Sequence, residues 1–516
     1  MIAYGSLFLH LGSLPLSGAD EPRYAQIARE MHESGNWVTP TLQGKPWMEK
    51  PPLYYWITSP LFYFFKSAET AARTGPAVCA LVAAIAVFYL GAALCSNMAG
   101  ALSAVILLAS LGYAGFGRSA STDMPFTCCF TIAMALLAAA ARKDIGPKVL
   151  AAYVFLGLSV LGKGPVAIIL AVGIGLCFWY WDERGGLIRR WLVMPGAVVC
   201  AAISIPWFWL AFRQNGYSFI ATFFINHNIA RFVTDIHHHS QPFYYYIPVL
   251  LALMFPWSGW LLLLILRSPV EGLRRWRQWD PSTVFLTCWF LVPIIFFSLS
   301  DSKLAGYILP SLPPLALILG IHLSRKLEGN TGLSGLRAAM GLHLALSAAM
   351  AIAAPIYFQK ECGGSWKVGV LLSVAIMIPA VFAFGFGLRG SCMRAFKATA
   401  LQGLIVLIST VLFAFPVLGA YHTTREIAYQ ALNLRKAGEL IATYRFFHHS
   451  LFYYTGYQIA EELNDSEELR KFAQTHPNSL VVTEAIRLRD ISGSAGLSVA
   501  ILGRQGDLIL LRISPK

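Results

Sequence analysis

Charged residues are scarce in this sequence. Asp, Glu, Lys and Arg make up 13% of the 516 residues, whereas hydrophobic residues make up 56%. Soluble globular proteins carry about 25% charged residues. The composition therefore excludes an ordinary soluble protein and indicates a membrane protein.

Acidic residues are the rarer of the two signs. The chain has 26 acidic and 40 basic residues, which gives a formal net charge of +14. The basic residues stand in short clusters between apolar segments, and this pattern favours anionic lipid head groups over nucleic acid. We therefore expect membrane lipids, and no nucleic acid, among the partners.

Cysteine patterning and a cleavable signal peptide are also lacking. The nine cysteines include no CxxC pair and lie mostly in apolar segments, so we expect small core residues rather than a disulfide or zinc framework. Residues 1–16 are apolar but have no basic start and no A-x-A site. This stretch is shorter than the roughly 20 residues of a spanning helix. Either it is a tilted, marginal span that ends near Gly18, or the chain begins upstream.

Long apolar segments dominate the chain as far as about residue 420. After the N-terminal stretch they cover residues 76–97, 99–117, 124–141, 149–162, 165–181, 191–212, 243–266, 282–300, 304–323, 338–358, 368–388 and 398–420. The two segments that flank Lys163 could be one broken helix. We predict an all-α polytopic membrane domain over residues 1–420, with about 13 transmembrane helices.

Basic residues alternate between the predicted loops. They concentrate in the loops at 142–148, 184–190, 267–277, 325–337 and 389–397. The positive-inside rule therefore predicts a cytoplasmic N-terminus. On this topology every unusual polar cluster falls on the outer side, at residues 20–50, 118–123, 163, 226–239 and 301–307. Because charge is costly in lipid, we predict that these clusters form one site.

The first outer loop, residues 17–73, is dense with charge for an apolar chain, and we call it the first polar loop. Residues 22–33 and 52–65 each predict a short helix, and the second follows a Pro-Pro pair that suits a helix start. After residue 420 the composition becomes mixed. Residues 434–442 and 466–474 favour helices, and residues 479–486, 497–503 and 507–513 favour strands. We predict a small periplasmic α/β domain over residues 421–516.

The polar clusters contain the groups that phosphate and acid–base chemistry need. Asp20, Glu21 and Asp123 are the carboxylates that could act as a general base. The cations that could clamp a phosphate are Arg23, Lys50, Lys163 and Lys303. Structural alternatives stay open: Asp20 and Glu21 could cap a helix and pair with Arg23, Lys163 could snorkel from a helix end, and Lys303 could pair with Asp301.

Residues 226–239 include a run of three histidines. Such a run could help to hold a divalent metal ion together with a distant carboxylate, or it could be a solvated loop.

The motifs, taken in order, resemble a known enzyme family. They are DEPRYAQIAREM, NWVTPTLQGKPWMEKPPLYYW, RSASTDMP, LGKGP, FFINHNIARF with HSQPFYYYIP, and SKLAGYILP, all within residues 18–314. This order is similar to that of the C-type superfamily of integral-membrane glycosyltransferases, and in particular to the aminoarabinose lipid A transferase branch of the protein mannosyltransferase-like family. The resemblance implies an inner-membrane enzyme that transfers a sugar, with inversion, from a polyprenyl-phosphate donor to lipid A or another lipid or glycan acceptor.

The resemblance also implies roles for single residues. Asp20 and Asp123 would be bases or would orient the acceptor, while Arg23, Lys50 and Lys163 would hold phosphate beside Tyr307. Glu49 and His239 match positions associated with a metal, which could be zinc, magnesium or manganese. The chain departs from the family pattern at Trp47, Asn226 and Ala305.

Two other functions stay open from the sequence. One is transfer to protein hydroxyl groups, as in protein O-mannosyltransferases. The other is transport of a lipid or sugar. A transporter would place its ionisable residues near the bilayer midplane, with repeat symmetry, whereas these residues crowd one surface and no internal repeat is visible.

Overall fold

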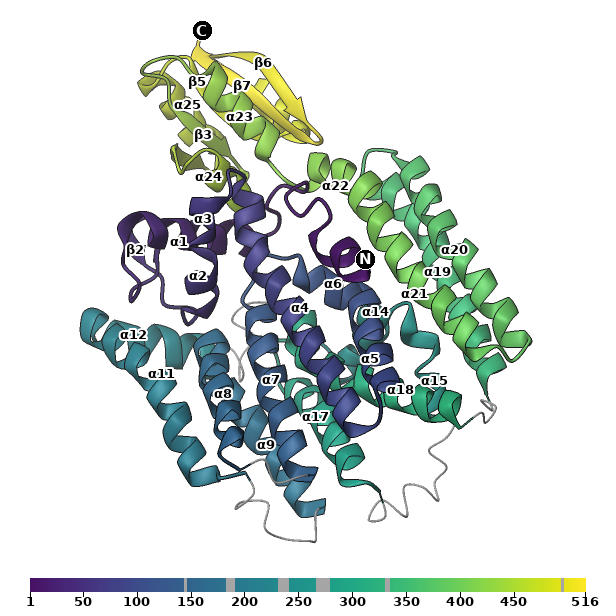
Figure 1. Cartoon of the computed structure of the whole chain (residues 1–516). Coiled ribbons are helices and arrows are strands. Elements are labelled where there is room, and N and C mark those ends of the chain that lie inside the picture. The colour runs from purple at the N-terminus through teal and green to yellow at the C-terminus, as the bar shows by residue number, and fades with distance from the viewer. Residues whose placement is uncertain (143–145, 182–190, 231–240, 266–278, 330–334, 493–495) are drawn as a thin grey trace.

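Helices form most of the structure, which is a computed structural model of residues 1–516. It describes all residues except 143–145, 182–190, 231–240, 266–278, 330–334 and 493–495. A helical bundle carries a small domain with a β-sheet at one end, and the first polar loop lies beneath that domain (Figure 1). The predicted fold class, a polytopic helical protein with a C-terminal α/β domain, is confirmed.

The N-terminal part of the chain is built from short elements. They are η1 (Tyr4–Phe8), α1 (Asp20–Ser34), β1 (Thr41–Leu42), β2 (Lys45–Pro46), α2 (Leu53–Thr58) and α3 (Leu61–Phe64). The first half of the bundle follows with α4 (Ala68–Leu94), α5 (Asn97–Ala109), α6 (Leu111–Gly117), α7 (Asp123–Arg142), η2 (Gly146–Val149), α8 (Leu150–Lys163), α9 (Val166–Trp181), α11 (Val193–Asn215), α12 (Tyr217–Phe219) and η3 (Ile220–Ala230).

The second half of the bundle has a similar mixture of long and broken helices. It contains η4 (Phe243–Tyr245), α14 (Tyr246–Met254), η5 (Trp257–Gly259), α15 (Leu262–Ile265), α17 (Pro281–Ser298), η7 (Ala305–Ser311), α18 (Leu312–Glu328), α19 (Leu336–Glu361), α20 (Trp366–Leu388), α21 (Cys392–Ser409), η8 (Thr410–Ala414) and α22 (Phe415–His422).

The apolar segments form fewer straight spans than the sequence suggests. Within the described residues, eight helices are long and apolar enough to cross a membrane, or up to ten if each bent pair is one span. The segments predicted at 99–117 and 243–266 are such pairs, bent by 70° and 118°. The N-terminal stretch has only the five-residue η1, which is too short to span as a straight helix. The predicted total of about 13 stays a prediction.

Three of the predicted polar clusters, in the first polar loop, at 118–123 and at 163, lie at one end of the bundle, whereas most of the cluster at 226–239 falls outside the described residues. Asp123, which begins α7, contacts Lys163, which ends α8. Near the start of α4, Arg73 contacts Glu21 in the first turn of α1. At the other end of α4, Ser96 donates a hydrogen bond to Glu328, which ends α18. The convergence predicted from charge is therefore confirmed for the clusters in the first polar loop, at 118–123 and at 163.

Helix α1 shows why the first polar loop folds. Its first turn carries two carboxylates, which the helix dipole favours. It ends at Gly35, whose φ of +66° suits a left-handed cap and whose N–H donates to Met31. One face is buried, and it includes Tyr24, Ile27, Ala28 and Met31. The predicted helix at 22–33 is confirmed, but the one at 52–65 is broken into α2 and α3 at Pro60, since proline has no N–H to continue it.

The C-terminal domain is a five-stranded sheet packed with helices. Its elements are α23 (Arg425–Leu434), β3 (Ile441–Tyr444), α24 (His449–Tyr454), β4 (Ile459–Leu463), α25 (Ser466–Thr475), β5 (Ser479–Glu484), η9 (Ala485–Arg487), α26 (Leu488–Ser492), β6 (Leu497–Gln505) and β7 (Leu508–Pro515). The strand order is β4-β3-β5-β7-β6. Strands β4, β3 and β5 run parallel, and β7 is antiparallel to both β5 and β6. The helix predicted at 434–442 is wrong, because β3 begins at Ile441 and pairs on both sides.

Polar contacts join this domain to the first polar loop. The Tyr454 hydroxyl donates to Glu69 of α4 at 2.9 Å and accepts from the Leu16 N–H at 2.7 Å. Arg425 also pairs with Glu69, at 3.2 Å. The Arg29 guanidinium lies 4.7 Å from the ring centre of Tyr453. The domain therefore helps to fix the loop that carries Asp20 and Lys50.

Candidate active site

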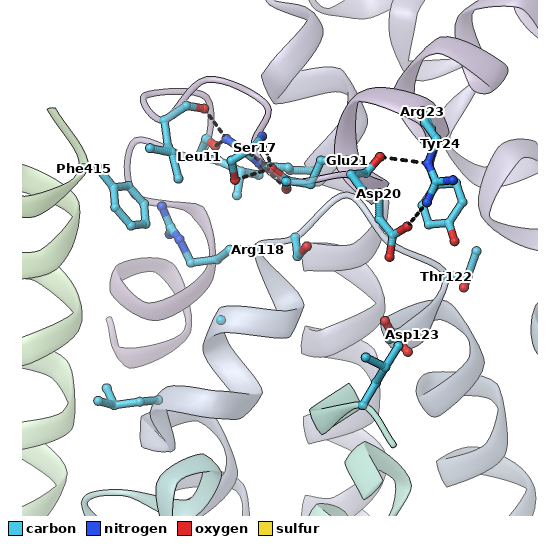
Figure 2. Close-up of a pocket in the computed structure, with 18 of the residues that line it drawn as sticks. Leu11, Ser17, Asp20, Glu21, Arg23, Tyr24, Arg118, Thr122, Asp123 and Phe415 are labelled. Carbon is cyan, nitrogen blue, oxygen red and sulfur yellow. Dashed lines mark hydrogen bonds and ion pairs between the residues drawn. The ribbon is translucent and has the colours of Figure 1, made fainter. Parts of the chain in front are cut away.

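A cavity of about 760 Å³ lies where the polar clusters meet. Its wall is formed by the first polar loop, α4, α6, α7, α8, η7, α21, η8 and α22, and includes Asp20, Glu21, Arg23, Glu49, Lys50, Arg73, Arg118, Asp123, Lys163, Tyr307 and Phe415. Figure 2 shows part of this lining. Of the residues predicted for the site, Lys303 is not on the cavity wall and His239 lies outside the described residues.

Asp123 and Lys163 form the inner ion pair of the cavity. The Lys163 ammonium donates to the Asp123 carboxylate. Each charge is also placed favourably on its helix, since Asp123 begins α7 and Lys163 ends α8. The Lys163 ammonium lies 5.6 Å from the ring centre of Tyr307. The Lys163 ammonium therefore points to Asp123, and the alternative in which it snorkels towards water does not fit the structure.

Gly306 lets the η7 segment approach this ion pair. A Cβ atom at this position would lie 3.0 Å from the Asp123 Oδ1 atom and 2.9 Å from a ring carbon of Phe116. Contacts this short require a shift of the neighbouring groups. The missing side chain therefore helps to set the position of Asp123, and Tyr307 follows directly in the chain.

Asp20 and Arg23 form a second, more exposed pair. They meet at 2.6 Å, with 53% of the Asp20 side chain exposed. Burial alone would lower the pKa of the Arg23 guanidinium, but Asp20 and, more weakly, Glu49 raise it above its usual value. The guanidinium lies 5.4 Å from the ring centre of Trp47. The pairing expected from the sequence is present, whereas the Asp20 side chain does not cap α1.

Glu21 does not have the environment of a catalytic base. Its two carboxylate oxygens accept hydrogen bonds from Arg73 at 3.0 and 2.7 Å, from the Ala120 N–H at 2.9 Å and from the Ser17 N–H at 3.0 Å. Burial raises the pKa of Glu21, but the charge and hydrogen bonds of Arg73 outweigh it and lower that pKa. The catalytic role predicted for Glu21 does not fit this geometry. The residue instead ties the first polar loop to α4 and to the turn before α7.

Lys303 is likewise engaged away from the cavity. Its buried ammonium donates to the main-chain carbonyl oxygens of Gln241, at 2.8 Å, and of Ser300. A phosphate-binding role for Lys303 therefore does not fit, because its ammonium points into the protein and Lys303 is not on the cavity wall. Nor does Lys303 form the ion pair with Asp301 that the sequence left open, as far as the described residues show.

The metal prediction stays untested. Glu49 is on the cavity wall, but His239 lies outside the described residues. Among the residues that the structure describes, no group of three or more His, Cys, Asp or Glu side chains could hold a metal ion. Because zinc usually takes four ligands, Glu49 alone does not make a metal site.

Arg118 belongs to the predicted polar cluster at 118–123, although no role of its own was predicted for it. It is 7% exposed and lies just after α6. Its guanidinium donates to the main-chain oxygens of Leu9 at 2.7 Å and Ser6 at 3.4 Å. Burial, with a smaller effect of Arg73, lowers the pKa of Arg118 to about 10. The sequence signals for Arg118 are its place in the outer polar cluster and at the boundary of an apolar segment, and neither shows which way the side chain points.

Comparison with known proteins supports the resemblance seen in the motifs. Residues 17–220 match the model of the dolichyl-phosphate-mannose-protein mannosyltransferase family. Over 319 residues the chain is 34% identical to the undecaprenyl phosphate-alpha-4-amino-4-deoxy-L-arabinose arabinosyl transferase of Photorhabdus laumondii, covering 59% of this chain but only 56% of that protein. The same-named protein of Edwardsiella ictaluri is 32% identical over 437 residues, which are 79% of this chain and 75% of the relative.

The chain belongs to this arabinosyl transferase family. Its fold agrees, because the crystal structure of ArnT from Cupriavidus metallidurans bound to undecaprenyl phosphate superposes with a TM-score of 0.78 at 22% identity. That match covers 99% of this chain and 96% of the other.

Two departures from the transferase family pattern lie at the cavity or next to it. Trp47 stands beneath Arg23, and its indole N–H is buried without a hydrogen-bond partner among the described residues. Ala305 begins η7, directly before Gly306. The third departure, Asn226, is exposed on η3. The changes at Trp47 and Ala305 are therefore the ones placed to alter the cavity.

Proposed function

We propose that this protein is an inverting glycosyltransferase that moves aminoarabinose or a related sugar from undecaprenyl phosphate to lipid A or another envelope lipid. The observation that carries the proposal is the cavity itself. It joins two carboxylates, each paired with a cation, in Asp123–Lys163 and Asp20–Arg23. Membership of the arabinosyl transferase family gives the donor and the sugar class.

The reaction is a single displacement. An acceptor oxygen forms a bond to the anomeric carbon while the bond from that carbon to the donor phosphate oxygen breaks. The phosphate leaves with the electron pair, so negative charge develops where the cations stand. Lys163, Arg23 and Lys50 would stabilise that charge. Attack on the face opposite the leaving group inverts the anomeric centre.

Ion pairing does not prevent the cations from holding phosphate. A lysine ammonium has three N–H donors, and Asp123 occupies one of those of Lys163. The carboxylates keep the cavity from being a purely positive site, which would bind the leaving phosphate too tightly. Asp123 and Asp20 would orient the acceptor, and would take its proton if the acceptor atom belongs to a hydroxyl group.

The site also implies a location. A polyprenyl donor confines the reaction to a membrane surface, and the family is bacterial. We place the chain in the inner membrane with a cytoplasmic N-terminus and a periplasmic C-terminal domain. The support is the excess of basic residues in alternate loops. Labelling of single introduced cysteines with an impermeant thiol reagent tests the orientation, and labelling of residue 325 from outside would contradict it.

The decisive test of function is mass spectrometry of the cell envelope. Lipid A, other envelope glycolipids and exported proteins are compared in cells with no protein, with the wild type and with Asp123→Asn. We expect a pentose-sized addition to a lipid only with the wild type. Addition to exported proteins would favour the mannosyltransferase-like alternative. Altered lipid flux without any new glycosidic bond would favour a transporter.

A further inference from the structure

The cavity has a second end, away from the two carboxylate–cation pairs. Figure 2 shows Arg118 and Phe415 on one side, and Asp20, Arg23 and Asp123 on the other. All of these residues line the same cavity. A substrate that fills the cavity would therefore meet two separate positive regions.

Arg118 is a buried charge with an incomplete set of partners. Its two hydrogen-bond acceptors are main-chain carbonyl oxygens, which carry no net charge. Its Nε atom is buried and has no hydrogen-bond partner among the described residues. Arg73 pairs with Glu21 and Arg23 with Asp20, but no carboxylate in the described part of the chain pairs with Arg118. A buried, unneutralised charge is costly, and an arginine fork on a cavity wall matches a phosphate group.

The wall beside Arg118 is apolar. It includes Leu111, Leu407, Val411 and Phe415. The last three belong to a run from Cys392 to His422 that is long and apolar enough to cross a membrane. The Phe415 ring centre lies 5.9 Å from the Arg118 guanidinium. A cation at the edge of such a wall suits an anionic group attached to a hydrocarbon chain.

We infer that Arg118 binds an anionic group of the acceptor lipid, separate from the atom that receives the sugar. This inference rests on the proposed function. The donor phosphate is bonded to the reacting carbon, so it must lie beside Asp123 and Lys163 at the other end. The charge at Arg118 therefore belongs to the acceptor. The enzyme would select acceptors that carry a phosphate at a distance from the reacting group.

Steady-state kinetics with both substrates test this role. Full-length protein in lipid nanodiscs receives undecaprenyl phosphate-aminoarabinose and bisphosphorylated lipid A. For Arg118→Gln we expect the KM for lipid A to rise by about tenfold or more, as for a lost hydrogen bond between charged groups, and the donor KM to stay within about twofold. Arg213→Gln, on an exposed arginine outside the cavity wall, is the matched control and should change neither value. A rise in both KM values together for Arg118→Gln would show a merely structural role and overturn the inference.

The substrate provides a second arm that needs no variant. For the wild type, the KM for a monophosphorylated lipid A that keeps the reacting group but lacks the other phosphate should exceed the KM for bisphosphorylated lipid A by the same factor as the Arg118→Gln change produces. For Arg118→Gln, the KM values for the two forms of lipid A should be nearly equal. An unchanged KM for the wild type would overturn the inference even if Arg118→Gln failed to fold.

Binding without donor separates this inference from the proposed function. A wild type that binds bisphosphorylated lipid A more tightly than Arg118→Gln, yet transfers no sugar, would contradict the proposed function and support the role of Arg118. Sugar transfer to lipid A by the wild type, together with equal binding of lipid A by the wild type and Arg118→Gln, would support the proposed function and contradict the role of Arg118. A wild type that neither binds nor glycosylates lipid A would overturn both.

Discussion

Asp123 and Lys163 lie 40 residues apart in the chain, yet their side chains form an ion pair on the wall of one cavity. One residue begins α7 and the other ends α8, so the antiparallel packing of two helices brings them together. A pair placed in this way can serve the reaction twice. On the proposed function, the carboxylate would face the acceptor and the ammonium would face the leaving phosphate.

Loss of the Asp123 charge should stop transfer. For Asp123→Asn we expect kcat to fall by about 100-fold or more, the usual size of a general-base or positioning effect. Asp20→Asn and Lys50→Ala should also abolish most activity. Rates are measured with purified protein and the undecaprenyl phosphate-linked sugar. Asp280→Asn is the matched control, because Asp280 caps α17 and asparagine caps equally well. Full activity in all three site variants would contradict the assignment of the cavity.

The Glu21–Arg73 pair should matter for stability rather than for the chemical step. Removal of one partner leaves a buried charge unpaired, and such changes cost about 3–5 kcal/mol. We expect Glu21→Gln to lower the temperature at which the purified protein loses its monodisperse form. The Glu21→Gln protein that remains folded should keep kcat within about a few-fold of the wild type, because the substitution lowers the free energy of unfolding rather than the rate of the chemical step. A folded, stable Glu21→Gln protein without activity would instead restore the catalytic role.

Sequence patterns identified much of the site because lipid excludes charge. Asp20, Arg23, Lys50, Asp123, Lys163 and Tyr307 stood out as polar groups beside apolar segments, and all of them line the cavity. The sequence could not show that Glu21 meets Arg73, or that Lys303 meets main-chain oxygens. These partners are distant in the chain, and only tertiary packing decides whether a charge turns towards a cavity or into the protein.

The secondary structure shows the same limit. Helix α25 and strands β5, β6 and β7 follow local patterns that the sequence displays. Strand β3 was mistaken for part of a helix because its neighbours favour helix. It is a strand because β4 and β5 pair with it on both sides. Arg118 received no role of its own for a related reason, since an arginine at the same apolar boundary could equally point towards solvent.

Acid should lower the stability of the folded protein through His449, which begins α24. Burial lowers the pKa of His449 to about 4 from 6.5, and the charges of Arg23 and His448 act in the same direction, while Asp20 opposes them. Between pH 6.5 and 4 the unfolded chain therefore binds more protons at this residue than the folded chain does. The stability that depends on neutral His449 is complete above pH 6.5 and falls as the pH drops.

The midpoint of thermal unfolding, followed from pH 7.5 down to 5, measures this effect. We expect a smaller decrease for His449→Leu than for the wild type. His476→Leu, in the residue that follows α25, should keep the wild-type slope. The range above pH 5 avoids the titration of Glu21, whose folded pKa is below 4.5 and whose contribution is lost only at lower pH. If the midpoint of thermal unfolding fell equally with pH in His449→Leu and the wild type, His449 would not be the source of the pH dependence.

Gly306 should be required for the position of Asp123. In Gly306→Ala the added methyl group would meet the Asp123 carboxylate at 3.0 Å and the Phe116 ring at 2.9 Å. The carboxylate is held by Lys163, so a shift would disturb the ion pair that is proposed to face both substrates. Because displacements of about 1 Å can cost about 100-fold in rate, we expect kcat to fall by at least about tenfold. Gly341→Ala, where the nearest neighbouring atom is 4.0 Å away, is the matched control and should keep full activity. Equal rates for the two variants would mean that the approach of η7 does not set the Asp123 geometry.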